Sequence, residues 1–120
     1  MRREQCETYV TMWHPEAEAE LAKVRDGKER YAIHTAIDKV RRNGPKVCHP
    51  HRKQVQGVAG LQSLRPRGGR SVWRVLYACS GERRYMLLAV TRTPRVSPRA
   101  FKSGVEKACR RAQGCGLEVG

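Results

Sequence analysis

Three arginines stand in a part of the chain that otherwise has the composition of buried strands. The stretch LRPRGGRSVWRVLYACSGERRYMLLAVTR, residues 64–92, contains Arg65, Arg74 and Arg92 among Val, Leu, Tyr and Ala. Burying an unpaired guanidinium group is costly, so such side chains need an anionic partner. Arginine can bind phosphate oxygens through two parallel hydrogen bonds, and a cluster could stabilise the charge of a phosphoryl-transfer transition state. The alternative is an edge of solvated or singly paired arginines without chemistry.

Two hairpins must bring these arginines together. Strands are predicted at residues 61–66, 71–79 and 83–92, with Gly-containing turns between them. If the first turn centres between Gly68 and Gly69, Arg65 and Arg74 are diagonal neighbours on one face. If the second centres on Gly81, Arg74 lies opposite Leu88 and Arg92 joins the same face. The prediction is conditional, because a slip of one residue in either register moves side chains to the other face.

The remaining elements are predicted from hydrophobic spacing and end signals. A strand is expected at residues 7–13 and a helix from Pro15 to Val24. A second helix follows, capped by Asp26 and ended by the Asn-Gly-Pro at 43–45, and a last one runs from Ser97-Pro98 to about residue 113. Residues 46–60 have no clear periodicity and are interpreted as a connecting segment. The expected order is β-α-α-β-β-β-α, an α+β fold whose mainly antiparallel sheet is packed by helices that cover one face.

Length and composition predict one soluble domain over residues 1–120, with 113–120 as a frayed tail. Twenty-five Lys and Arg against eleven Asp and Glu give a net charge of +14. A field of this sign attracts polyanions, so nucleic acid or an acidic protein partner is expected. No hydrophobic run is long enough to span a membrane and no leader is recognised, so we expect a cytoplasmic protein with no membrane partner.

The cysteines and histidines do not predict a metal site or a disulfide framework. Five cysteines include no repeated CxxC pair, and the CHPHR segment at 48–52 offers three ligands where zinc needs four. We therefore expect no cofactor and no metal.

The segment at residues 60–94 resembles the core of the RelE/ParE toxin superfamily, in its phage-derived, HigB-like branch. The motif elements are a Leu-Arg pair, a loop, a Tyr-Arg-x-x-Tyr pattern, a hairpin and an apolar strand that ends in basic residues. The flanking elements agree, so the likeness covers most of the chain. The resemblance implies a toxin neutralised by an antitoxin, commonly a helix-turn-helix protein, with an acidic contact surface expected here. It also implies a metal-independent endoribonuclease that cleaves mRNA on the ribosome, the 2′-hydroxyl attacking the adjacent phosphate.

Four residues match the family motif. Arg65 matches the Leu-Arg arginine, Arg74 the arginine of Tyr-Arg-x-x-Tyr, Tyr77 its second tyrosine, and Arg92 a basic residue after the last strand; Trp73 replaces the first tyrosine. The resemblance implies that Arg74 and Arg92 stabilise the phosphate and that Arg65 positions it. Tyr77 is the fourth candidate, although packing is the simpler role for a strand tyrosine.

Departures from the family pattern keep other functions open. Lysines common on the second strand of relatives are replaced by Leu-Gln-Ser at 61–63, and one basic residue after the last strand is missing. The final helix also lacks a late tyrosine. The proton-transfer residue is thus unassigned, with His49, His51 and Lys102 as candidates. The alternatives are a ParE-like gyrase inhibitor and a phage or mobile-element protein that binds nucleic acid without cutting it.

Overall fold

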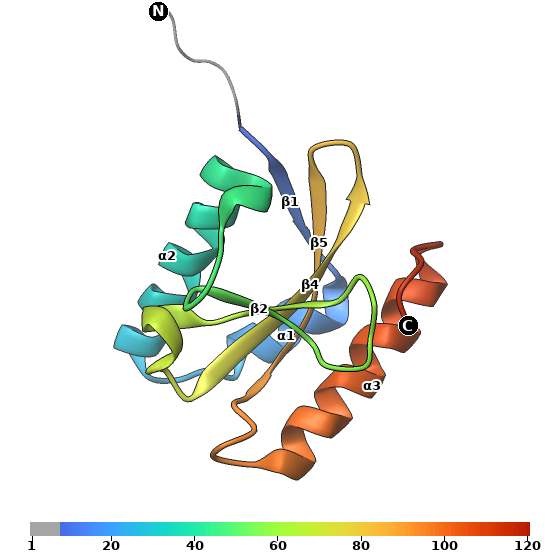
Figure 1. Cartoon of the computed structure of the whole chain (residues 1–120). Helices are drawn as coiled ribbons and strands as arrows, with labels where there is room; N and C mark the ends of the chain where they lie inside the picture. Colours follow the sequence, from blue (N-terminus) through green and yellow to red (C-terminus); the bar gives the residue numbers. More distant parts are fainter. Residues whose placement is uncertain (1–7) are drawn as a thin grey trace, which may run out of the picture.

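Residues 8–120, which the computed structural model describes, form three α-helices, two 3-10 helices and a five-stranded sheet (Figure 1). In chain order these are β1 (Val10–Trp13), α1 (Pro15–Ala22), α2 (Gly27–Asn43), η1 (Gly44–Lys46), β2 (Arg52–Gln54), β3 (Gln62–Leu64), η2 (Pro66–Gly69), β4 (Trp73–Gly81), β5 (Arg84–Arg92) and α3 (Pro98–Gly114). None of the helices in this part of the chain has the length and hydrophobicity to cross a membrane.

The helices begin at the residues that the end signals predict. The Asp26 side chain accepts hydrogen bonds from two backbone amides in the first turn of α2, at 2.8 and 3.3 Å. Ser97 accepts one from Ala100 at the start of α3, at 3.2 Å. Each bond satisfies an amide that the helix itself leaves unpaired. The three predicted helices are confirmed, and the predicted start of the first strand at Glu7 lies outside the described residues.

The sheet has the strand order β1-β5-β4-β3-β2, in which β1 runs parallel to β5 and the other pairs are antiparallel. The predicted order lacked β2, whose three residues are too few to show a strand periodicity. The observed order is therefore β-α-α-β-β-β-β-α.

Helices cover both faces of the sheet, where we expected one. Apolar residues of α1 and α2 pack with Val75, Tyr77 and Leu87 on one face, and α3 packs with Leu76 and Leu88 on the other (Figure 1). The reason lies in the middle of β4 and β5, where the runs VLYA and LLAV are apolar at every position. A strand with this composition is buried on both sides.

The registers of both hairpins differ from the predicted ones. Ser63 pairs with Leu76 instead of Arg74, because η2 shifts the centre of the first turn. Arg74 pairs with Thr91 instead of Leu88. The second turn is formed by residues 82–83. Ser80 is an extra residue in β4 between the paired Cys79 and Gly81, and Leu88 is an extra residue in β5 between the paired Leu87 and Ala89. Together these shift the register by three residues, an odd number that exchanges the two faces of β5 at its end.

The residues after α3 lie against the loop before β3. The amide of Gly120 donates to the carbonyl of Ala59 at 2.9 Å, and Leu117 and Val119 pack against the cluster that α3 forms with the sheet. The prediction that residues 113–120 form a frayed tail is therefore wrong. The contacts of this segment could not be predicted, because the helical periodicity ends near residue 113.

Candidate phosphate-binding site

Arg74 is a buried cation whose hydrogen bonds go to backbone carbonyls. Its side chain is on the face of β4 that α3 covers, and the residue is 4% exposed. Nη1 donates to the carbonyls of Ser71 and Trp73 at 2.9 and 2.8 Å, and Nη2 donates to that of Gly69 at 3.2 Å. Within residues 8–120 no carboxylate forms an ion pair with Arg74.

The electrostatics of Arg74 favour an added anion. Burial, and then the neighbouring charges of Arg65 and Arg95, lower the pKa of Arg74 to about 10. The group still carries its proton at neutral pH, and the repulsion between the three guanidinium groups is uncompensated. A phosphate here would be bound by cations that are already held in place.

The loop between β3 and β4 holds Arg74 in position. Gly69 has φ of +96°, and a Cβ at this position would lie 2.8 Å from Nη2 of Arg65. A side chain would therefore displace Arg65. Ser71 donates a short hydrogen bond from Oγ to Oε1 of Glu29 and accepts one from the amide of Trp73 at 3.0 Å. The other Glu29 oxygen pairs with Arg67 at 3.0 Å, so α2 anchors both ends of the loop.

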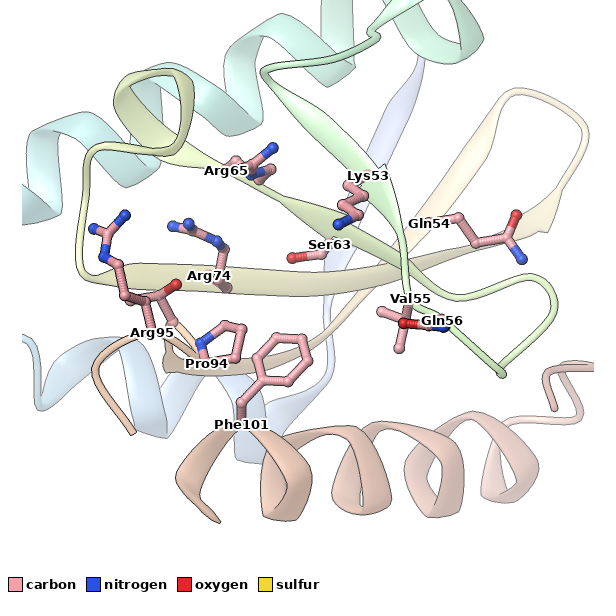
Figure 2. Close-up of a pocket in the computed structure, with 11 residues that line it drawn as sticks. Lys53, Gln54, Val55, Gln56, Ser63, Arg65, Arg74, Pro94, Arg95 and Phe101 are labelled. Carbon is pink, nitrogen blue, oxygen red and sulfur yellow. The ribbon is translucent and has the colours of Figure 1, made fainter. Parts of the chain in front are cut away.

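Arg74 opens into a pocket of about 400 Å³ that contains four basic residues (Figure 2). Arg65, Arg74 and Arg95 gather at one end, and Lys53 lies across from them. Ser63, Thr93 and Phe101 also line the pocket. No carboxylate of the described chain pairs with any of the four cations.

Strand alternation explains how these side chains meet. Lys53 of β2 pairs with Ser63 of β3, and Ser63 pairs with Leu76 of β4, so the three residues share a face. Arg65 and Arg74 lie two residues from Ser63 and Leu76 and have the same orientation. Arg95 comes from the turn after β5, where the amide of Val96 donates to the carbonyl of Thr93 at 3.0 Å.

The structure brings together two of the three predicted arginines. Arg65 and Arg74 line the pocket, whereas Arg92 pairs with Trp73 in the ladder and therefore lies on the other face. Its guanidinium carbon is 4.6 Å from the centre of the Trp73 ring. The single shared surface predicted for Arg65, Arg74 and Arg92 is wrong, because of the register shift in the second hairpin.

Tyr77 lies in the core and not in the pocket. It is 1% exposed, on the face that α1 and α2 cover, with its ring 5.7 Å from that of Tyr85. Burial raises the pKa of its hydroxyl. Even less of this hydroxyl is ionised at neutral pH than in an ordinary tyrosine, so it is poorly suited to accept a proton, which agrees with the packing role.

Sequence reasoning missed Lys53 and Arg95. Lys53 belongs to a strand of three residues inside the segment interpreted as a connection, and Arg95 follows a proline in a turn, where no periodicity applies. The segment TRTPR at 91–95 contains a second arginine three residues after Arg92, and this indicates Arg95 as a candidate once the strand register is known. His49, His51 and Lys102, the candidates for proton transfer, do not line this pocket.

The pocket suits charge stabilisation more than acid-base chemistry. Its lining contains guanidinium, ammonium, hydroxyl and amide groups, and among its described residues no imidazole or carboxylate. In residues 8–120 no group of three His, Cys, Asp or Glu side chains could hold a metal ion. The ligand that this arrangement fits is a phosphate group.

Two comparisons with known proteins bear on this site. A family model described as phage derived protein Gp49-like (DUF891) matches residues 19–110. The solved structure of a double arginine-to-alanine mutant of the E. coli toxin RelE in the free state is similar in fold. Its TM-score is 0.58 at 16% identity, over 82% of this chain and 96% of that chain. No curated protein has a significant match to the sequence. Together the two matches confirm the resemblance to the RelE-like superfamily and the α+β fold class.

Proposed function

Because this chain belongs to the phage-derived Gp49-like family and has the fold of the RelE toxin, we propose that it is the toxin of a toxin–antitoxin pair. We further propose that it cleaves mRNA on the ribosome as a metal-independent endoribonuclease. The observation that carries the proposal is Arg74, a buried cation without a carboxylate partner among residues 8–120, beside Arg65, Arg95 and Lys53.

In the proposed reaction the ribose 2′-oxygen attacks the adjacent phosphorus. A P–O2′ bond forms and the P–O5′ bond breaks, which leaves a 2′,3′-cyclic phosphate and a free 5′-hydroxyl. Arg74 and Arg95 stabilise the charge that develops on the phosphate oxygens, and Arg65 orients the phosphate. Lys53 donates the proton that the departing 5′-oxygen needs, and the proton of the 2′-hydroxyl leaves to solvent.

One observation favours a second candidate, a protein that binds nucleic acid without cutting it. Among the residues of the described chain that line the pocket there is no side chain of the usual general-base type, imidazole or carboxylate. Under this alternative the four cations bind a phosphodiester and no bond breaks. A gyrase inhibitor of the ParE type would differ from both candidates, because it would reduce DNA supercoiling by gyrase and leave the messages intact.

The test is to induce the chain in cells and to map the 5′ ends of messages. Arg74→Ala is expected to abolish both growth arrest and new 5′ ends, whereas Arg110→Ala, an exposed arginine of α3 outside the pocket, should retain both. Because Arg74 is buried, Arg65→Ala serves as a second variant, with thermal unfolding of each protein measured. Intact messages with the wild-type chain, together with salt-dependent RNA binding, would establish the second candidate instead.

A further inference from the structure

Arg65 lines a second hollow as well as the pocket described above. This hollow, about 300 Å³ in volume, lies between α2 and the segments that carry His51 and η2. We name it the α2 groove and define it by Lys28, Tyr31, Lys39, His51, Arg65 and Arg67. Because Arg65 is common to both, the α2 groove and the Arg74 pocket are neighbours, and a ligand that contacts Arg65 in one can continue into the other.

The α2 groove has a lysine at each end of its helical wall, with the small residues Ala32, Thr35 and Ala36 between them. Lys28 and Lys39 are eleven residues apart on one helix, which is three turns, so both side chains lie on the same side. No acidic residue of the described chain lines the groove. Arg67 is neutralised by Glu29, but among residues 8–120 no carboxylate forms an ion pair with Lys28, Lys39 or Arg65. These cations suit a ligand that carries several negative charges.

Tyr31 adds an aromatic surface at the middle of the groove. It is 75% exposed, the most exposed of the large hydrophobic residues within 8–120, while the neighbouring Ala32 and Ile33 are buried. Its ring therefore adds little to the packing of α2. An exposed aromatic side chain between backbone-binding cations is the arrangement by which proteins hold unpaired bases.

We infer that single-stranded RNA bound at the Arg74 pocket continues across Arg65 into the α2 groove, where Lys28 and Lys39 contact its backbone and one base stacks on Tyr31. This inference rests on the proposed function and extends it, since it makes α2 part of the substrate-binding surface. Charge complementarity and continuity through Arg65 favour RNA over an acidic peptide, which supplies the charge but no base to stack.

The test is equilibrium binding of labelled 2′-O-methyl RNA, which cannot undergo 2′-attack. A dinucleotide is short enough to occupy the Arg74 pocket alone, and an octanucleotide reaches the groove. Tyr31→Ala should weaken binding of the octanucleotide by about 5- to 150-fold, the loss expected for one stacked base, and should leave the dinucleotide unchanged. Tyr31→Phe, which keeps the ring, should bind both RNAs as the wild type does.

Charge is tested separately by the salt dependence of octanucleotide binding. Lys39→Gln should reduce the slope of log affinity against log salt by about 0.7, the value for one phosphate contact on a single strand. Lys23→Gln, an exposed lysine outside the groove, is the matched control and should leave the slope unchanged.

Three outcomes overturn the inference. If Arg74→Ala weakens both RNAs while Tyr31→Ala weakens neither, the groove does not bind RNA and the proposed function stands. If Arg74→Ala weakens neither RNA, the proposed function fails and the inference fails with it. If Tyr31→Ala weakens binding of a polyglutamate peptide as much as that of the octanucleotide, the groove is a protein-binding surface.

Discussion

At the scale of single residues, the site depends on an arginine in an unusual environment. Three carbonyls, of Gly69, Ser71 and Trp73, accept hydrogen bonds from Arg74 and fix its orientation without neutralising it. A carboxylate partner would have given a structural ion pair. Carbonyls instead satisfy the donors and leave the positive charge available, which is the property that a phosphate site needs.

Arg92 contrasts with Arg74, because it is exposed and its guanidinium group stacks on the indole ring of Trp73. We predict that Arg92→Ala retains the proposed ribonuclease activity and loses about 0.5–1 kcal/mol of stability, the value of an exposed cation–π contact. Cleavage of a defined mRNA and urea unfolding measure the two effects. Loss of mRNA cleavage in a stably folded Arg92→Ala protein would contradict this prediction and would show that Arg92 takes part in the reaction.

At the scale of elements, α2 supports the loop that carries the site. Glu29 is not in the pocket, but its two oxygens contact Ser71 and Arg67 on either side of Gly69 and Arg70. Ser71 in turn supplies a carbonyl to Arg74. A change at Glu29 should therefore reach Arg74 through the backbone of the loop.

We predict that Glu29→Ala weakens dinucleotide binding and lowers stability by about 1.5–3 kcal/mol, the range for a hydrogen bond to a charged group. Glu29→Gln should recover most of the affinity, since an amide oxygen also accepts a hydrogen bond from Ser71. Dinucleotide affinity and thermal unfolding are the measurements. Asp38→Ala is the matched control, because Asp38 pairs with Arg41 and Arg42 on the same helix away from the loop. Equal dinucleotide affinities for Glu29→Ala and Asp38→Ala would contradict the positioning role.

At the scale of the whole molecule, one buried arginine of α3 joins that helix to α1 and to β5. Arg111 of α3 pairs with Glu20 of α1 at 2.8 Å and with Glu16 at 3.2 Å, and it donates to the carbonyl of Leu88 in β5. Glu20 also accepts the amide of Val90 at 2.9 Å. The extra residue Leu88, which places Arg92 on the face away from the pocket, thus accepts a hydrogen bond from α3 through its carbonyl.

This connection predicts a stability that depends on acid pH. Burial raises the pKa of Glu20, but the hydrogen bonds from Arg111 and Val90 outweigh it, so the pKa lies below its ordinary value of 4.5. As the pH falls below 4.5 the unfolded chain takes up the proton first, and the stabilisation is lost as the pH passes the lower, folded value. Denaturant unfolding between pH 7 and 3 should show this loss for the wild type and for Glu18→Gln, an exposed control. The loss of unfolding free energy between pH 7 and 3 should be smaller for Glu20→Gln. Parallel plots of unfolding free energy against pH for Glu20→Gln and the wild type would contradict the role of Glu20.

The sequence by itself determined the helices, the long hairpin, the fold class and the need for an anion. Caps such as Asp26 and apolar spacing act within one segment, so they can be read without knowing the rest of the chain. Net charge and the family motif are likewise properties of the sequence, and they pointed to Arg65 and Arg74 and to a phosphate ligand.

Only the tertiary structure decided which cations share the pocket. Whether Arg92 or Arg95 lies beside Arg74 depends on a two-residue turn and on two extra residues, Ser80 and Leu88, and local preferences do not distinguish these registers. Lys53 enters through a strand of three residues that exists because β3 pairs with it. Side chains alternate between faces with a period of two, so an odd shift exchanges their positions, and register is decided by packing on both faces of the sheet.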